Sequence, residues 1–138
     1  PLWDSTIVIL SPDHGYPYPN GIANYNPLRY RIPMAIIGGA LQQQMQVPTL
    51  CSQIDLVPTV LHAMGLDTQA YPFSKNILDT TQTQFAFYAF NDGFALLTPQ
   101  DTIIVDAKAN MLLQGDNDSL KQQAQAVIQR IMEDIEKL

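Results

Sequence analysis

Cysteine, basic residues and long hydrophobic runs are all scarce in this sequence. Its 138 residues include a single cysteine, so the chain holds no internal disulfide. Only 7 residues are Lys or Arg against 13 that are Asp or Glu, and the net charge of −6 argues against binding to nucleic acid. No apolar run approaches the roughly 20 residues that cross a bilayer. The longest, Thr6–Leu10 and Met34–Leu41, have the length of strands.

The composition that remains is globular, with 46% hydrophobic and 14% charged residues. Thr6–Leu10 is apolar on both faces, which predicts a buried inner strand of a parallel sheet. A loop rich in proline and glycine follows over residues 11–27, and Arg29–Ile37 predicts a second buried strand. Val47–Cys51 predicts a short third strand. The first half therefore has the pattern of an α/β fold.

A helix is expected between Asp55 and Gly65. Asp55 is the predicted N-cap, because Pro58 then falls in the first turn, and Gly65 is the predicted C′ residue. Ser52 and Asp55 also match a capping box, which leaves the alternative of an earlier start. The predicted buried stripe of this helix consists of Leu56, Val60, Leu61 and Met64.

The second half has a different sequence pattern, in which short predicted strands alternate with turn residues. Asp92-Gly93 indicates a hairpin and Pro99-Gln100-Asp101 a second turn, so we expect an antiparallel meander of three or four strands. Apolar residues recur at helical spacing over Asp118–Leu138, which predicts a long C-terminal helix covering one face of the meander. The aromatic residues assigned to the meander core and its cross-strand pairs are Phe85, Phe87, Tyr88, Phe90 and Phe94.

An acid and an imidazole stand side by side just after the first predicted strand. Open α/β sheets bind ligands at the carboxyl ends of their strands, and Asp13 and His14 lie at such an end. A carboxylate and a neutral imidazole suit a divalent cation such as Mn²⁺, Zn²⁺ or Mg²⁺, and Gly15 gives the turn the freedom to bring both onto one ion. The alternative is a polar turn without a ligand. Further ligands are poor candidates: His62 lies in the predicted helix, Asp55 is a cap, and Asp92, Asp101 and Asp106 belong to meander turns.

Three segments together resemble a known family. DSTIVILSPDHG, RIPMAIIGGAL and SQIDLVPTVLHAMGL resemble, in order and spacing, the C-terminal part of the sulfatase / alkaline-phosphatase superfamily. Two later segments, Tyr71–Leu78 and Phe85–Phe94, look more like the lipoteichoic-acid-synthase-like sulfatases. The resemblance implies the C-terminal part of an alkaline-phosphatase-like three-layer sheet over residues 1–78, followed by the meander and helix over 79–138, with the catalytic N-terminal part absent.

The resemblance also implies a function. Asp13 and His14 would bind one divalent metal (Mn²⁺, Mg²⁺ or Ca²⁺), and the nucleophile, a Thr or a Ser/Cys converted to formylglycine, would lie upstream of this chain. The whole protein would hydrolyse or transfer sulfate or phosphate esters, as a sulfuric ester hydrolase or as a phosphoglycerol or phosphoethanolamine transferase. The two-metal members need a further histidine, and His62 in a helix is a poor candidate, which favours the one-metal branches.

The sequence begins without Met or a basic leader, and we interpret it as a piece of a longer protein that is inactive by itself and binds its metal weakly or not at all. The parent is expected at the extracytoplasmic, periplasmic face of a bacterial inner membrane, held there by upstream segments. Its substrate would be a small-molecule, glycan or lipid-headgroup ester, and a cut sheet edge would favour self-association. The alternatives are a non-catalytic binding or structural domain with a degenerate site, and a two-metal phosphodiesterase.

Residues of the loop and its borders are candidates for substrate binding. Tyr16 offers a flat apolar face with a hydroxyl, and Arg31 a guanidinium for an anionic group; loop packing and a solvated strand end are the alternatives. The same alternatives, substrate binding or a structural role in the loop and strand end, apply to Tyr18, Tyr25 and Arg29. The loop after Gly15 lacks the basic residue that often faces the sulfate in arylsulfatases. Elsewhere, Lys75 is expected at the surface and Cys51 as a small buried hydrophobic residue.

Overall fold

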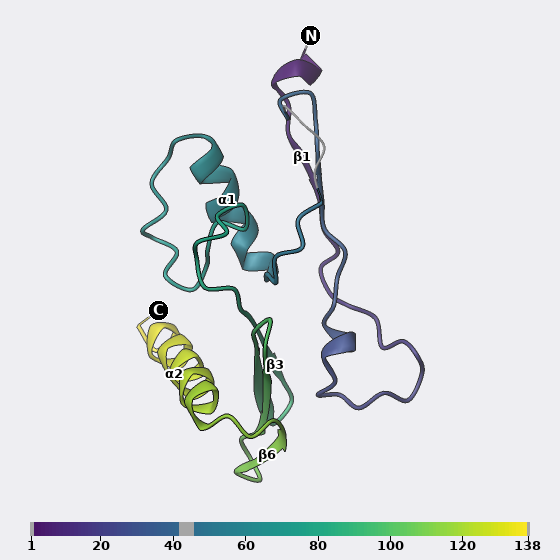
Figure 1. Cartoon of the computed structure of the whole chain (residues 1–138), viewed down its shortest axis with the longest axis vertical. Helices are drawn as coiled ribbons and strands as arrows, with labels where there is room; N and C mark the ends of the chain where they lie inside the picture. Colours follow the sequence, from purple (N-terminus) through teal and green to yellow (C-terminus); the bar gives the residue numbers. More distant parts are fainter. Residues whose placement is uncertain (1, 42–45, 138) are drawn as a thin grey trace. The chain divides into compact units, whose positions relative to one another are not determined.

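The computed structural model describes residues 2–41 and 46–137, which form two compact units, residues 1–48 and 49–138 (Figure 1). Each unit is described by itself. The first α-helix lies in the second unit together with the meander, and the boundary that the resemblance implies at residues 78 and 79 stays a prediction. In the described ranges, no helix has both the length and the apolar character needed to cross a bilayer.

Unit 1, residues 1–48, is built around a short antiparallel ribbon. Strand β1 (Val8–Leu10) pairs with strand β2 (Ala35–Ile37). A 3₁₀ helix, η1 (Leu2–Ser5), precedes β1, and a second, η2 (Pro27–Arg29), lies in the loop between the strands. Asn26 caps η2 by accepting a hydrogen bond from the Leu28 N–H at 2.9 Å, so the loop ends in an ordered turn directly before β2.

Both predicted strands of unit 1 are shorter than expected, and the expectation of a buried parallel strand is wrong for the described residues. The partner of β1 is antiparallel, and Ile9 and Leu10 are exposed. A continuous apolar run indicates a strand that suits burial on both faces, but a two-stranded ribbon covers neither face. The short strand predicted at Val47–Cys51 is also absent: these residues have no regular structure.

Unit 2 begins with a 3₁₀ turn, η3 (Gln53–Asp55), that leads directly into helix α1 (Leu56–Ala63). Pro58 falls in the first turn of α1, as predicted, where its missing N–H breaks no helical bond. The Asp55 side chain does not cap α1; it accepts from the Ser52 N–H at 2.8 Å, so the capping-box alternative holds for η3. Gly65, with φ +72°, ends the helix as predicted.

The buried face of α1 differs from the predicted stripe. Leu56 is buried, but Met64 is exposed, and Val60 and Leu61 are half-buried. The positions that share burial with Leu56 are Pro58 and Thr59. The polar Thr59 is buried because its hydroxyl is fully used in hydrogen bonds, which apolar periodicity does not reveal.

The meander is confirmed as a four-stranded antiparallel sheet in the order β3-β4-β5-β6. Its strands are β3 (Ala86–Phe90), β4 (Gly93–Leu97), β5 (Thr102–Asp106) and β6 (Met111–Gln114). Asn91 and Asp92 connect β3 to β4, and Asp92 has a φ of +77°, as a tight hairpin requires. The predicted turn at Pro99-Gln100-Asp101 joins β4 to β5.

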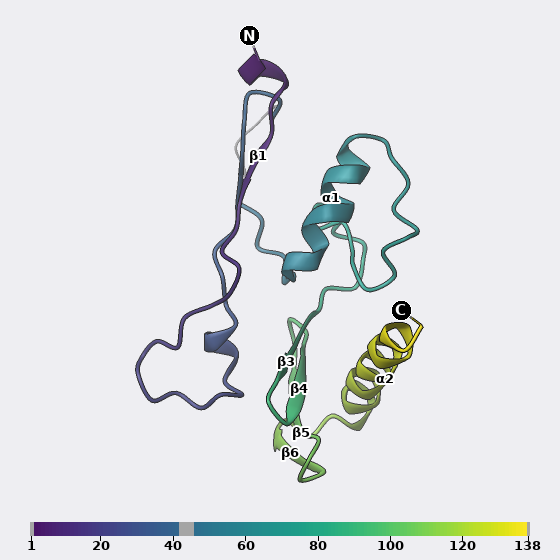
Figure 2. The same cartoon turned by 180° about the vertical axis from the view of Figure 1, so that it is seen from behind.

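Helix α2 (Asp118–Ile135) packs against β4 and β5, as predicted (Figure 2). Asn117 caps it by accepting from the Leu120 N–H at 3.0 Å. The core between helix and sheet contains Phe94, Leu96, Ile103, Val105, Leu120 and Ala124, with Phe85, Phe87, Leu112 and Ile128 packed against it. The Phe87 and Phe94 rings stack with centroids 6.2 Å apart, which confirms the core role of these two aromatic residues.

Candidate functional site

Asp13 and His14 lie in a bend that follows the end of β1. Their side chains are turned toward one another, with Asp13 Oδ1 and His14 Nε2 3.7 Å apart. Both are open to solvent, with side-chain exposures of 90% for Asp13 and 79% for His14. The turn thus brings together the two residues that the sequence proposed as metal ligands, which an extended strand would place on opposite faces.

The second ring nitrogen of His14 is engaged by the backbone. Nδ1 lies 2.8 Å from the carbonyl oxygen of Gly15. A carbonyl only accepts, so in the neutral ring Nδ1 carries the hydrogen, and the lone pair is on Nε2, the atom that faces Asp13. Metal-binding histidines usually donate their other N–H to a carbonyl or carboxylate in this way.

The spacing of the two donor atoms also suits one ion. Metal–ligand distances of about 2.1 Å place two donors of a tetrahedral site about 3.4 Å apart. The observed 3.7 Å between Asp13 Oδ1 and His14 Nε2 is close to this value. With His14 protonated, the same contact would be an exposed ion pair, which contributes little to stability. The donor set therefore fits a divalent metal as two members of its ligand sphere.

The remaining ligands are not found in the described ranges, where no group of three or more His, Cys, Asp and Glu side chains gathers. His62 lies in α1, as predicted, and its side chain is exposed. Asp101 and Asp106 accept hydrogen bonds from nearby N–H groups, and Asp92 lies 3.9 Å from Lys108, so these three carboxylates have the turn roles expected of them. Catalytic metals usually have at least three protein ligands.

Gly15 fits its position because it has no side chain. A Cβ atom there would lie 2.1 Å from the carbonyl oxygen of Arg29 and 3.3 Å from that of Arg31. The turn that carries Asp13 and His14 therefore packs directly against the segment leading into β2. The residues just before this turn and those at the start of β2 line an apolar depression of about 450 Å³. These residues are Ile9, Leu10, Ser11, Pro12, Pro33, Met34 and Ala35.

The predicted substrate residues occupy the same unit. Tyr16 is exposed, as is Arg31, for which no acidic partner lies among the described residues. Arg29 is half-buried, and its guanidinium donates to the carbonyl of Ile22 at 3.3 Å. Tyr18 is exposed and Tyr25 half-buried. Arg29 thus stabilises the loop, while Tyr16 and Arg31 are accessible to a ligand.

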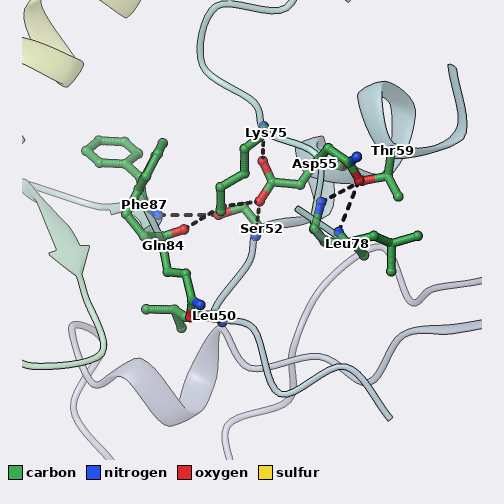
Figure 3. A network of polar contacts seen from close by, with 11 residues as sticks. Leu50, Ser52, Asp55, Thr59, Lys75, Leu78, Gln84 and Phe87 are labelled. Carbon is green, nitrogen blue, oxygen red and sulfur yellow. Dashed lines mark hydrogen bonds and ion pairs between the residues drawn. The ribbon is translucent and has the colours of Figure 1, made fainter. Parts of the chain in front are cut away.

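Another cluster of charges, the Asp55–Lys75 cluster, was not predicted (Figure 3). Lys75 was expected at the surface, and that expectation is wrong: Lys75 is 6% exposed and Asp55 1%. Their Nζ and Oδ2 atoms are 2.5 Å apart, and Nζ also donates to the carbonyl of Phe85 at 2.7 Å. The Lys75 N–H donates to Asp55 Oδ1 at 2.9 Å. The ammonium lies 4.5 Å from the centre of the Phe85 ring.

Neutral hydrogen bonds extend this cluster through unit 2. The Thr59 hydroxyl donates to the Asp55 carbonyl at 2.6 Å and accepts from the Ile77 N–H at 3.0 Å. Ser52 Oγ accepts from the Phe87 N–H at 3.4 Å. Figure 3 shows that these contacts join α1, the loop after it and the start of the meander. In the described ranges every buried side-chain polar atom has a partner. The cluster is therefore structural, and it explains why α1 belongs with the meander.

Cys51 lies beside this cluster but is no nucleophile. It is half-buried, and burial, followed by the negative charge of Asp55, raises the pKa of its thiol above 9.0, although Lys75 acts in the opposite direction. Less thiolate is therefore present at neutral pH than in a free cysteine. This agrees with the expectation that Cys51 is a packing residue.

Comparisons with known proteins agree with these findings. The family model Sulfatase matches residues 1–66, which include β1, Asp13, His14, β2 and α1. The structure is similar to that of a protein in the alkaline phosphatase superfamily from Vibrio parahaemolyticus, with a TM-score of 0.69 and 22% sequence identity over 90% of this chain. The chain spans 33% of the length of that protein. The sulfatase family model thus covers the part that carries the candidate metal ligands, and the chain has a fold found in the alkaline phosphatase superfamily.

Proposed function

We propose that this chain is part of a sulfatase-like, metal-dependent enzyme that acts on sulfate or phosphate esters, with Asp13 and His14 as two ligands of its divalent metal. One observation carries the proposal: Gly15 holds His14 Nδ1, so that Nε2 faces the Asp13 carboxylate at 3.7 Å. The family match over residues 1–66 supports the choice of enzyme class.

A divalent metal bound at this pair would polarise the ester oxygens and help to activate a nucleophile. The residues of this chain have simpler tasks. Asp13 offsets part of the positive charge, and the Gly15 carbonyl keeps His14 in the tautomer that can bind. The high exposure of both side chains leaves space for further ligands and for a substrate. The second histidine, His62, is part of α1, so we propose one metal rather than two.

The finer assignments rest on the sequence resemblance. We propose a sulfuric ester hydrolase or a phosphoglycerol or phosphoethanolamine transferase, similar to the lipoteichoic-acid-synthase-like sulfatases and located at the periplasmic face of an inner membrane. The substrate would be a small-molecule, glycan or lipid-headgroup ester. The exposed Ile9 and Leu10 of β1 support the further proposal that the isolated chain self-associates.

Metal titration of the 138-residue chain tests the central claim. We expect weak binding of Mn²⁺ in calorimetry, because the described residues supply only two protein ligands. Asp13→Ala and His14→Ala should each weaken this binding by at least about tenfold, since even loss of an outer-shell partner has that effect. His62→Ala is the matched control and should leave the affinity unchanged. Equal affinities in the wild type and Asp13→Ala would contradict the proposal.

The imidazole tautomer provides a second test without metal. Long-range ¹H–¹⁵N spectra resolve the 2 histidines of the chain. We expect the neutral His14 ring to carry its hydrogen on Nδ1, and the exposed His62 gives a second signal for comparison. If His14 carries the hydrogen on Nε2, it cannot present a lone pair to a metal beside Asp13.

Activity assays distinguish the proposal from a non-catalytic domain. We expect the isolated chain to show no turnover of sulfate or phosphate esters, because the described residues supply only part of a metal site. In the whole protein, Asp13→Ala should abolish activity. Turnover by the isolated chain that depends on Asp13 would overturn the first expectation. Unchanged activity of the whole protein after Asp13→Ala would favour a binding or structural domain.

A further inference from the structure

The loop between β1 and β2 contains the only asparagine of the chain that directly precedes a glycine, Asn20 before Gly21. The side-chain amide carbon of an asparagine lies within reach of the main-chain nitrogen of the next residue. Attack by that nitrogen closes a five-membered ring, and a following glycine favours the attack because it has no Cβ atom to crowd the nitrogen. The pair is therefore a place where a covalent change can occur without an enzyme.

The structure holds this pair in an exposed turn. The N–H of Ile22 donates to the carbonyl oxygen of Pro19 at 3.4 Å, so Asn20 and Gly21 are the two central residues of the turn. Both are exposed. Gly21 has a φ of +86°, and a Cβ atom built there would meet nothing within 4 Å. No neighbouring atom therefore obstructs the rotation of the turn that ring closure needs.

Neither reacting group is engaged by another part of the described chain. Among the residues that the structure describes, the side-chain amide of Asn20 has no hydrogen-bond partner, and the N–H of Gly21 has no acceptor. Such a hydrogen bond would have to break before the ring could close. The amide carbon and the nitrogen are thus both available for the reaction.

Other asparagines of the chain are placed differently. Asn26, in the same loop, accepts a hydrogen bond from the Leu28 N–H at 2.9 Å. It is followed by Pro27, whose nitrogen has no hydrogen to give up. The side chains of Asn76 and Asn117 also accept main-chain hydrogen bonds, each at 3.0 Å. The fold thus engages these three side chains and leaves Asn20 free.

We propose that Asn20 is a site of spontaneous deamidation, in which the main-chain nitrogen of Gly21 attacks the side-chain amide carbon of Asn20. The nitrogen gives its proton to hydroxide and forms a bond to Cγ. The Cγ–Nδ2 bond breaks, and Nδ2 takes up a proton and leaves as ammonia. Water then opens the resulting succinimide ring at one of its two carbonyl carbons. The reaction consumes one water and releases one ammonia, and it needs no oxidant or reductant.

The position at which the ring opens decides the product. Opening at Cγ gives aspartate, and opening at the main-chain carbonyl carbon gives isoaspartate, in which the backbone continues through the side chain. Either product has a carboxylate where the neutral amide stood, and this carboxylate is ionised at neutral pH. The loop that begins just after Asp13 and His14 thus gains a negative charge as the protein ages, and isoaspartate also lengthens its backbone.

Peptide mapping of the aged chain tests the proposal. The 138-residue chain is incubated at pH 8, digested with trypsin and analysed by mass spectrometry, and a freshly purified sample corrects for conversion during digestion. Asn20, Asn24 and Asn26 lie in one tryptic peptide, residues 1–29, so the last two are internal controls. We expect Asn20 to convert first, and an isoaspartyl methyltransferase should label the isoaspartate. Earlier conversion of Asn24 or Asn26 would overturn the assignment.

Two substitutions test the attacking and the attacked group. Gly21→Ala should slow the conversion of Asn20 by at least about tenfold, because the added Cβ atom crowds the nitrogen. Asn20→Gln keeps a side-chain amide but would need a larger ring, and should therefore leave the peptide unlabelled by the methyltransferase. Equal rates in the wild type and Gly21→Ala would overturn the attack by the Gly21 nitrogen. Isoaspartate in the Asn20→Gln peptide would place the reaction at another residue.

A synthetic peptide of residues 16–25 measures the same reaction without the fold. The folded chain should convert Asn20 at a rate within about tenfold of the peptide, since the structure leaves both reacting groups open. A rate below that range would mean that the fold protects the turn, and the proposal would be wrong. Gly21→Ala in the peptide separates the effect of the Cβ atom from any change in the fold.

Discussion

Replacing Lys75 by methionine tests the contribution of the Asp55–Lys75 cluster to folding. Methionine keeps most of the aliphatic length of lysine and its packing over the Phe85 ring. It removes the ammonium, and the Asp55 carboxylate, which is 1% exposed, then has no counter-charge. The substitution therefore isolates the electrostatic part of the cluster from its packing.

The expected loss is a large share of the total stability. Breaking a buried ion pair from one side costs about 3–5 kcal/mol, while domains are stable by about 5–15 kcal/mol. Asp55 keeps hydrogen bonds from the N–H groups of Ser52 and residue 75, so we expect the lower end, about 3 kcal/mol, and a fall in Tm of about 10 °C. Adding Asp55→Asn removes the stranded charge and should recover part of this loss.

Urea unfolding followed by circular dichroism measures the effect. Lys108→Met is the matched control, because Lys108 is 78% exposed and lies 3.9 Å from Asp92. Such a surface pair contributes at most about 1 kcal/mol. The reasoning is refuted if Lys75→Met costs no more than Lys108→Met. It is also refuted if the double variant with Asp55→Asn is no more stable than Lys75→Met alone.

Three further predictions concern other parts of the chain. Gly15→Ala should weaken Mn²⁺ binding in calorimetry, because its Cβ would lie 2.1 Å from a backbone carbonyl and displace the turn; an unchanged affinity contradicts this. Iodoacetamide should alkylate Cys51 at pH 8 more slowly than free cysteine, because burial and then Asp55 raise the pKa of the thiol. Asp55→Asn should accelerate the alkylation of Cys51. A slower alkylation in this variant would count against the effect of the Asp55 charge on the thiol pKa. Hydrogen bonds from the hydroxyl and N–H of Thr81 lower the pKa of Asp79 below 3.8. The stabilising contribution of the Asp79 carboxylate is therefore present above the pKa that Asp79 has in the unfolded chain, and it is lost as the pH falls through the pKa of the folded chain. Thr81→Ala should raise the midpoint of the Asp79 titration measured by NMR.

Features that depend on a few neighbouring residues could be predicted from the sequence. The hairpin at Asp92 and the helix end at Gly65 both need a positive φ, which only a few residue types adopt easily. The stripe on α2 follows from helical periodicity, and Leu120 and Ala124 lie in the core as expected. Asp13 and His14 are adjacent in the chain, so their proximity needed no knowledge of the fold.

Features that depend on distant residues could not be predicted in this way. The apolar character of β1 indicates a strand, but its burial depends on what packs against it, and Ile9 is exposed. Lys75 resembles an ordinary surface lysine because no local pattern connects it to Asp55, which lies across the loop that follows α1. The close approach of Gly15 to the backbone carbonyl of Arg29 likewise depends on how two separate segments pack, which the sequence alone does not specify.

The contact of Gly15 with the backbone on either side of Tyr30 has a consequence for how such a site can change. The packing of Gly15 fixes the turn that carries Asp13 and His14 against the segment before β2, so we expect the intervening loop to tolerate changes in length and sequence. Under the proposed function, an exchange of the segment between Tyr16 and Leu28 would alter the surroundings of a substrate without moving the two proposed metal ligands. If the chain belongs to such an enzyme, the turn and the loop would have separate tasks, the turn binding the metal and the loop contacting the rest of the substrate, and loop grafting would then alter selectivity.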